Sequence, residues 1–327
     1  MVDIKKQVDQ AKNILLTTHR SPDGDAIGSV CFLYRVLRKM GKEVRIYIPD
    51  APSANLLPFL KGTEFSFYEE EKETCDTQLH RFDLLFHLDY NSTSRVGAVM
   101  EGIFEKMTAF QIMIDHHPNP TLDCGIQISK PAYSSTAELL FDVVAFNGWE
   151  EYIDTEAAKA CYLGMLTDTG SFRYPSVTSN THRILAFLLD LNISHHSIHE
   201  AIYDSSTLDK VKLRAYAVVE KLEIIEENIG IISLSNEELR RFHYQKGDTE
   251  GLVNVILSVE GINVAVLAME KEEGIKISFR SKGEYFVNDF AQKYFKGGGH
   301  KYAAGGFSSA SLPETLEEIK KNCIAYF

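Results

Sequence analysis

The residues best suited to chemistry lie in the stretch T-H-R-S-P-D-G-D-A-I-G-S, residues 18–29, which holds His19, Asp23 and Asp25 close together. Carboxylates and an imidazole are typical ligands of divalent metal ions. Gly24 separates the two aspartates and allows a backbone conformation that a residue with a Cβ resists. An isolated Asp-x-Asp is also typical of a helix N-cap, which is the simpler interpretation of the motif by itself. The stretch therefore predicts a helix cap or a metal site.

The segments on either side indicate where this motif lies in the fold. Residues 13–18 form a short apolar run typical of a β-strand, and residues 26–40 carry apolar side chains at helical spacing. The motif is thus expected on a strand-to-helix turn. In an open parallel sheet, ligand sites gather at the carboxyl ends of the strands. The sequence therefore places the motif at the ligand-binding edge of a predicted sheet.

Three further predicted elements end at acidic or histidine residues. A strand over 83–88 leads to Asp89, a strand over 110–114 leads to Asp115-His116-His117, and a helix over 155–166 leads to Asp168. Together with the first motif, the predicted metal ligands are His19, Asp23, Asp25, Asp89, His116 and Asp168. This oxygen-rich set without thiolates suits Mn²⁺, Mg²⁺ or Fe²⁺ better than structural Zn²⁺. Six ligands favour two ions bridged by one carboxylate, an arrangement suited to phosphoester hydrolysis.

The whole composition narrows the class of protein. The 327 residues suffice for two domains, and the polar N-terminus without a long apolar run predicts a cytoplasmic protein with no membrane partner. Five scattered cysteines without a C-x-x-C pair argue against a disulfide framework and a thiolate zinc site. A net charge of −12 disfavours a long basic groove for polymeric nucleic acid. Small anionic substrates remain compatible with this charge.

The hydrophobic patterns predict an α/β protein with two domains. Residues 1–190 are expected to form a parallel-sheet α/β domain, in which Ser135 and Glu138 make the capping box of a helix ending near 146. Residues 191–222 are expected to form a helical linker. Residues 223–327 are expected to form a smaller α+β domain, with strands over 229–234, 263–269 and 275–280.

Near the C-terminus, the segment G-G-G-H-K-Y-A-A-G-G over 297–306 surrounds a His-Lys pair with glycines. Exposed backbone N–H groups and cations can bind phosphate, so a flexible anion cradle is one interpretation. A mobile surface loop is the alternative. Another histidine group, His195, His196 and His199, lies on a predicted helix without acidic partners, and we predict no catalytic role for it.

The order of these motifs resembles the DHH/DHHA1 phosphoesterase superfamily. The matching segments are T-H-R-S-P-D-G-D-A-I-G-S, L-D-Y-N, I-D-H-H-P, T-D-T-G-S-F and G-G-G-H-K-Y-A-A-G-G, which together extend over nearly the whole chain. The compact size is most similar to the nanoRNase/pAp phosphatase branch, the bifunctional oligoribonucleases. The resemblance implies a DHH domain, a helical linker and a DHHA1 domain, with the active site in the cleft between the two domains.

The resemblance also implies roles for individual residues. One Mn²⁺ would be held by His19, Asp23 and Asp89, and a second by Asp25, Asp89, His116 and Asp168. His117 would contact the scissile phosphate, and Asp115 would orient His116. The substrate's other phosphate would be bound by Arg280, Gly298, Gly299, His300 and Lys301.

The implied reaction is attack of a metal-activated hydroxide on short oligoribonucleotides or pApA, giving mononucleotides, and on pAp, giving AMP. An exopolyphosphatase, a pyrophosphatase, a RecJ-type exonuclease or a non-catalytic nucleotide-binding regulator are the alternatives. The glycine-rich segment argues against a pyrophosphatase, and the presence of all six ligands argues against a regulator. A homodimer and a monomer both remain open. Tyr90, where many relatives have a small residue, is expected either to stack on a base or to pack against the sheet.

Overall fold

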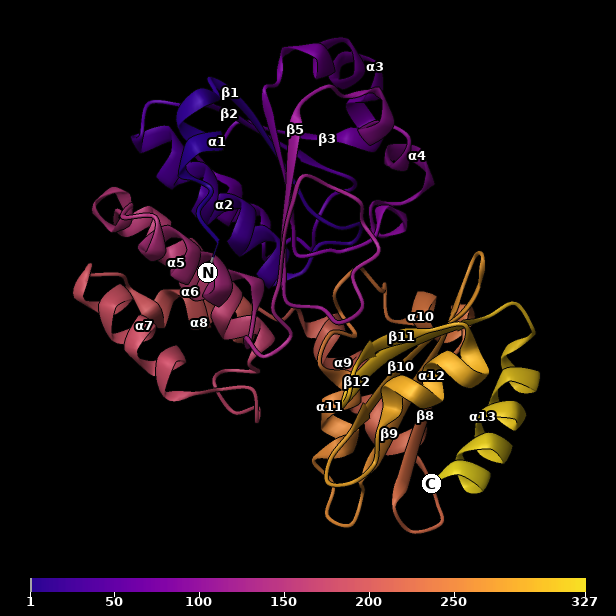
Figure 1. Ribbon diagram of the computed structural model, residues 1–327. Helices are drawn as coiled ribbons and strands as arrows, with labels where there is room; N and C mark the ends of the chain where they lie inside the picture. The colour runs from indigo at the N-terminus through magenta and orange to yellow at the C-terminus, as the bar shows by residue number, and fades with distance from the viewer. Residues whose placement is uncertain (1) are drawn as a thin grey trace. The chain divides into compact units, whose positions relative to one another are not determined.

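The computed structural model describes residues 2–327. The chain forms two compact units, and the division between them falls between Ser205 and Ser206 (Figure 1). The sequence predicted boundaries at residues 190 and 222. The division into two units does not test those boundaries, which stay predictions. Within residues 2–327, no helix is both long enough and apolar enough to cross a membrane.

The first unit is built on a six-stranded sheet whose strands all run parallel, in the order β3-β2-β1-β4-β5-β6. In such a sheet the crevice for a ligand lies where the strand order reverses, which here is between β1 and β4. The strands are β1 Asn13–Thr17, β2 Glu43–Ile48, β3 Phe65–Phe67, β4 Leu84–Leu88, β5 Phe110–Asp115 and β6 Ile126–Ser129. β1, β4 and β5 confirm the three strands predicted above, whereas the short edge strands β3 and β6 were not predicted.

Helices cover both faces of this sheet, as Figure 1 shows for α2, α5 and α6 on one side and α3 and α4 on the other. The central strands β1 and β4 are almost wholly buried and mainly apolar, which is typical of parallel strands covered on both faces. The helices of the first unit are α1 Lys5–Gln10, α2 Gly24–Lys39, α3 Tyr68–Gln78, α4 Ala98–Glu101, α5 Thr136–Phe146, α6 Thr155–Asp168, α7 Ser179–Asp190 and α8 His195–Tyr203. Short 3₁₀ helices lie at Leu57–Leu60, Leu79–Arg81, Thr93–Val96, Phe104–Lys106 and Glu150–Tyr152.

Two glycines allow α2 and α6 to approach closely. A Cβ on Gly28 would lie 2.6 Å from the carbonyl oxygen of Ala160, and a Cβ on Gly164 would lie 2.7 Å from an oxygen of Asp25. Side chains at these positions would push the helices apart. The close approach therefore brings the start of α2, where Asp25 lies, next to α6, which ends at Asp168.

The start of α5 differs in one respect from the predicted capping box. The Ser135 side chain accepts a hydrogen bond from the N–H of Glu138, as predicted. The Glu138 carboxylate instead accepts from the N–H and hydroxyl of Ser134 and from the hydroxyl of Thr181 on α7. Only half of the capping box forms, because the buried carboxylate has these other donors. Glu138 thereby ties α7 to the start of α5.

The second unit is a smaller α+β domain, as predicted, with the strand order β11-β12-β10-β9-β8-β7. The pair β8 and β9 is parallel, and the other pairs are antiparallel. Its strands are β7 Glu223–Ile225, β8 Ile229–Leu234, β9 Val264–Lys271, β10 Gly274–Ser281, β11 Gly298–His300 and β12 Ala303–Ser308. Its helices are α9 Leu208–Glu220, α10 Asn236–Arg241, α11 Leu252–Leu257, α12 Val287–Phe295 and α13 Leu312–Tyr326. One apolar cluster packs α12 and α13 against the sheet, and another packs α9, α10 and α11 against it.

The glycine-rich segment forms a β-hairpin, β11 and β12, instead of the flexible loop that its composition suggested. A Cβ on Gly297 would lie 1.9 Å from the carbonyl oxygen of Gly305. Gly299 has a φ of +141°, and a Cβ there would lie 2.4 Å from the carbonyl oxygen of Ala303. These glycines are thus required by close backbone approach. Pairing of β12 with β10, a partner distant in sequence, stabilises the hairpin, so local composition did not predict it.

Candidate metal centre

His19 and His116 both direct Nε2 away from the backbone. The Nδ1 atom of His19 lies 2.9 Å from the carbonyl oxygen of Arg20, and Nδ1 of His116 lies 3.2 Å from that of Tyr133. Because a carbonyl oxygen only accepts, each Nδ1 carries the hydrogen. In the neutral ring, Nε2 then keeps its lone pair, which is the usual arrangement of a metal-binding histidine.

Asp89 lies between these two imidazoles, directly after β4 and at the point where the strand order reverses. One carboxylate oxygen is 3.4 Å from Nε2 of His19, and the other is 3.8 Å from Nε2 of His116. The second oxygen also accepts a hydrogen bond of 2.8 Å from the Thr136 hydroxyl. Asp89 is 1% exposed and has a φ of +65°. Its two oxygens thus face two different groups of candidate ligands.

The two aspartates of the first motif have different positions. Asp23 is the N-cap of α2, since one of its oxygens accepts from the N–H groups of Asp25 and Ala26, each at 3.0 Å. The same oxygen lies 3.9 Å from Nε2 of His19, so the capping residue also faces the candidate site. Asp25 is buried, and its carboxylate accepts from the N–H groups of Thr136 and Ala137 at 2.6 and 2.9 Å. The start of α5 therefore fixes the Asp25 carboxylate.

Asp168, the last residue of α6, completes the set, with a carboxylate oxygen 3.1 Å from Nε2 of His116. The structure brings all six predicted ligands together in the first unit. Atoms able to bind a metal lie within 4.8 Å of one another in one group of His19, Asp23 and Asp89 and in another of Asp25, His116 and Asp168. Metal binding by these groups stays a prediction.

The electrostatics of the centre favour a divalent cation. Burial, followed by the charges of Asp89 and Asp168, raises the pKa of Asp25 well above its usual value. Burial and the charge of Asp23 raise the pKa of Asp89 to about 7. Burial lowers the pKa of His116, but Asp168, Asp25 and Asp89 together raise it well above its usual value. Among residues 2–327, no lysine or arginine pairs with Asp25 or Asp89, so a bound cation is the group that would stabilise both as carboxylates.

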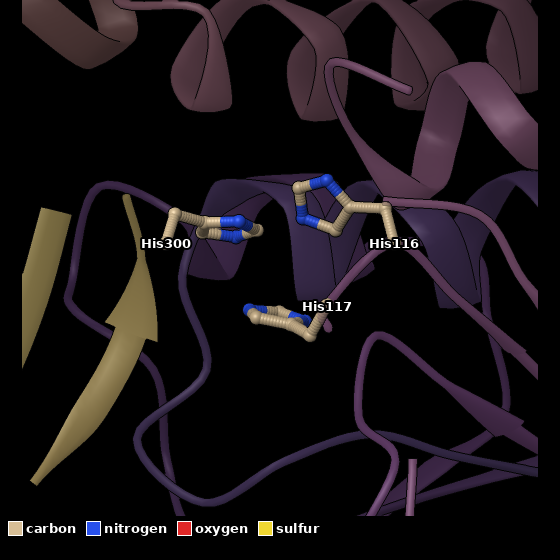
Figure 2. Close-up of side chains that lie close together, drawn as sticks. All are labelled: His116, His117 and His300. Carbon is tan, nitrogen blue, oxygen red and sulfur yellow. The ribbon is translucent and has the colours of Figure 1, made fainter. Parts of the chain in front are cut away.

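Asp115 contacts His117, and the prediction that it orients His116 is wrong. One Asp115 oxygen lies 2.7 Å from Nδ1 of His117, and the other accepts the His117 N–H at 2.9 Å. Although burial opposes it, the hydrogen bond with His117 lowers the pKa of Asp115. The turn after β5 folds the chain back, so the carboxylate reaches the ring two residues on. The imidazoles of His116 and His117 leave successive residues (Figure 2), and their ring centroids lie 4.7 Å apart.

The predicted substrate-binding residues of the second unit lie on β10 and on the β11–β12 hairpin. Arg280 and His300 both pair with Ala303 of β12, one from each side, so their side chains share a face of the sheet. Gly298 pairs with Gly305 in the next row on that face, and a Cβ on Gly298 would meet no atom within 4 Å. In this row the three residues nearest the edge of the sheet, Gly298, Gly305 and Ser278, are all small. The Lys301 ammonium lies over the Phe286 ring, 4.0 Å from its centroid.

Two features of the first unit were not predicted or were left open. Thr136 joins two candidate ligands, because its N–H donates to Asp25 and its hydroxyl donates to Asp89. The sequence S-S-T-A-E was interpreted only as the start of a helix. The threonine in this sequence has a hydroxyl and an N–H that can both donate to carboxylates, and this was the signal that could have identified Thr136. Tyr90 is 1% exposed and packs against the sheet, so the alternative of base stacking is wrong.

The second histidine group lies apart from these candidate ligands. Nε2 of His199 lies 3.2 Å from the Tyr162 hydroxyl. Nε2 of His196 lies 3.3 Å from a carboxylate oxygen of Glu200, so the expectation that this group has no acidic partner is wrong. Within residues 2–327, neither belongs to a group of ligand atoms close enough to bind one metal ion.

Comparison with known proteins identifies both units. Residues 13–165 match the model of the DHH family N-terminal domain, and residues 231–327 match that of the DHHA1 domain. The chain is 31% identical, over 94% of its length and 87% of the relative's, to a Thermus thermophilus protein named bifunctional oligoribonuclease and PAP phosphatase NrnA. A Bacillus subtilis protein of the same name is 28% identical over 95% of this chain and 94% of its own length.

A solved structure supports the same assignment. The crystal structure of an exopolyphosphatase-related protein from Bacteroides fragilis superposes with a TM-score of 0.92 and 34% sequence identity. The match covers 98% of this chain and 94% of the other. The chain therefore belongs to the DHH family, as a phosphoesterase with a DHH domain followed by a DHHA1 domain.

Proposed function

We propose that this chain hydrolyses short oligoribonucleotides, including pApA, to mononucleotides and converts pAp to AMP, using two divalent cations, with Mn²⁺ as the preferred ion. The observation that carries the proposal is the position of Asp89, whose two carboxylate oxygens face Nε2 of His19 and Nε2 of His116. A carboxylate in this position suits a bridge between two cations. The names of the two relatives, which match over nearly the whole chain, support the substrate class.

The candidate ligands divide into two sets that share Asp89. In the proposal, His19, Asp23 and Asp89 hold one ion, and the other is held by Asp25, Asp89, His116 and Asp168. Divalent cations at such a centre polarise a phosphoester and make water a nucleophile at neutral pH. The protein's part is to keep both imidazoles in the Nδ1–H form and to fix the buried carboxylates through Thr136 and Ala137.

His117 is proposed to contact the scissile phosphoryl group. The Asp115 carboxylate accepts from Nδ1–H and from the backbone N–H of His117, which fixes both the tautomer and the ring orientation. Nε2 is then the atom that faces the substrate. In the neutral Nδ1–H ring Nε2 carries no hydrogen, so it donates to a phosphoryl oxygen only in the imidazolium form, in which both nitrogens are donors. In that form Nε2–H is a donor fixed in advance at the place where negative charge develops, which stabilises the transition state.

The residues proposed to bind the substrate's other phosphate are Arg280, Gly298, Gly299, His300 and Lys301. The hairpin presents backbone N–H groups and cationic side chains beside a row of glycines, which suits a phosphate. A second phosphate site makes the enzyme selective for length, because a substrate of a few nucleotides can fill both sites. Arg280→Ala is expected to raise KM for pAp while leaving kcat within a few-fold.

The test is a panel of substrates with and without Mn²⁺, comprising pAp, pApA, a thirty-nucleotide RNA and polyphosphate. The proposal predicts Mn²⁺-stimulated release of AMP from pAp and of mononucleotides from pApA, with much slower turnover of the long RNA. Polyphosphate is included because the Bacteroides fragilis protein is named exopolyphosphatase-related. Equal rates on pApA and the long RNA, or turnover of polyphosphate alone, would contradict the proposed substrate class.

A further inference from the structure

A chain of buried hydrogen bonds beneath Asp89 joins β1, β4 and β5. The Tyr90 hydroxyl lies 2.7 Å from the Thr17 hydroxyl and 2.5 Å from Nδ1 of His87. Nε2 of His87 lies 2.9 Å from the side-chain oxygen of Gln111 on β5. Thr17, His87 and Tyr90 are each at most 1% exposed. None of these residues belongs to the six candidate ligands.

The donors of this network follow in part from what the partners can donate. The amide oxygen of Gln111 only accepts, so Nε2 of His87 carries a hydrogen. None of the described residues places a carboxylate against His87, and a buried imidazole without such a partner is neutral, so Nδ1 of His87 accepts from the Tyr90 hydroxyl. The Thr17 hydroxyl has two acceptors for its one hydrogen, the Tyr90 oxygen at 2.7 Å and the Phe86 carbonyl oxygen at 3.1 Å. The four side chains and this carbonyl group form one hydrogen-bonded network.

This network depends on a bend in the chain at Asp89. Residues three apart on an extended strand project from opposite faces, so His87 and Tyr90 would not meet on a straight strand. The φ of +65° at Asp89 turns the chain and brings the Tyr90 ring back beneath β4. Few residues other than glycine adopt this conformation without support. The same bend directs the Asp89 carboxylate toward His19 and His116.

We propose that Tyr90 is a positioning residue, whose hydroxyl holds the left-handed backbone of Asp89 through His87 and Thr17. The side chain after the aspartate thereby sets where the aspartate's two oxygens lie. This inference rests on the proposed function only in taking Asp89 as a metal ligand. Tyr90 contacts neither substrate nor metal, because it is buried within the apolar cluster on the other side of the bend.

The experiment compares the full-length protein with Tyr90→Phe and Tyr47→Phe. Both tyrosines are 1% exposed and belong to the same apolar cluster. Tyr47 is the control because, among residues 2–327, its hydroxyl has only the weakly hydrogen-bonding Cys75 thiol as a partner. Mn²⁺ binding is measured by calorimetry, and exchange coupling between bound ions by electron paramagnetic resonance. Tyr90→Phe is expected to weaken Mn²⁺ binding about 10- to 100-fold, to reduce the coupling, and to lower kcat without raising KM for pAp. Tyr47→Phe should match the wild type in all three.

The possible outcomes separate the two claims. If the wild-type protein binds no Mn²⁺, the proposed metal centre fails. If the wild type binds two ions and Tyr90→Phe binds them equally well with the same coupling, the positioning role of Tyr90 is overturned. If Tyr90→Phe does not fold by circular dichroism, Gln111→Met removes the acceptor for His87 from β5 and takes its place. Unchanged Mn²⁺ affinity in a folded Gln111→Met variant overturns the inference as well.

Discussion

At the scale of single residues, neighbouring side chains of the D-H-H motif have separate partners. His116 donates to a carbonyl and faces the carboxylates, whereas His117 is held by Asp115. The sequence motif predicted a chemical role for all three residues, and these roles stay predictions. It could not indicate which imidazole Asp115 contacts, because that depends on the turn after β5.

The contact between Asp115 and His117 predicts the effect of Asp115→Asn. The amide can accept only one of the two His117 hydrogen bonds, so the ring loses its fixed orientation. Steady-state kinetics are expected to show a fall in kcat of about 10²-fold. Mn²⁺ affinity should stay within a few-fold of the wild type, because His116 keeps its hydrogen bond to Tyr133. His116→Ala is the matched variant, and it should lose Mn²⁺ affinity. A comparable loss in Asp115→Asn would mean that Asp115 acts on His116 after all.

At the scale of elements, strand ends position the chemistry. Apolar runs ending in Asp or His predicted β1, β4 and β5, because a buried parallel strand needs a continuous apolar run. The edge strands β3 and β6 lack such a run, and the β11–β12 hairpin depends on a partner distant in sequence, so none of these was predicted. The helix-cap and metal-site interpretations of Asp23 were treated as alternatives, yet its capping oxygen also faces His19.

The close packing of α2 on α6 predicts that Gly28→Ala is destabilising. The new Cβ would lie 2.6 Å from a backbone oxygen, which must move. Urea unfolding is expected to show a loss of about 1–3 kcal/mol. Mn²⁺ affinity should fall too, because the start of α2 carries Asp25. Gly102→Ala is the control, since a Cβ there meets no atom within 4 Å. Equal stability of the two variants would contradict this account of the packing.

At the scale of the whole molecule, the buried acidic residues of the candidate metal centre make the stability of the fold depend on pH, and a bound metal ion is expected to change that dependence. Asp25, Asp89 and His116 all have raised pKa values, so the folded metal-free protein holds protons that the unfolded chain releases. The free energy of unfolding therefore falls as the pH rises above the unfolded-state pKa of each group. For Asp89 this loss continues until the pH passes the folded-state pKa of about 7. Burial lowers the pKa of His87 to about 4, which acts in the opposite direction below pH 6.5.

The prediction is that metal-free protein has a lower Tm at pH 8 than at pH 6.5 and that Mn²⁺ raises Tm more at pH 8. The opposing contribution of His87 is small in this window, because the unfolded-state imidazole is already at least half deprotonated at pH 6.5. Protons compete with the metal at the lower pH, so the stabilisation by Mn²⁺ grows as they leave. Thermal unfolding of the wild type and Asp89→Asn measures both effects. The Asn variant lacks one titrating carboxyl and should show a smaller dependence on pH. An increase of the metal-free Tm with pH would contradict the assignment.

The most direct test of the central claim is the number of Mn²⁺ ions bound per chain, measured with the turnover of pAp, in the wild type and Asp89→Ala. A carboxylate shared by two ions predicts two Mn²⁺ and rapid release of AMP for the wild type. The Ala variant should lose tight binding of both ions and all Mn²⁺-dependent turnover. Two tightly bound ions and full turnover in Asp89→Ala would contradict the two-metal centre.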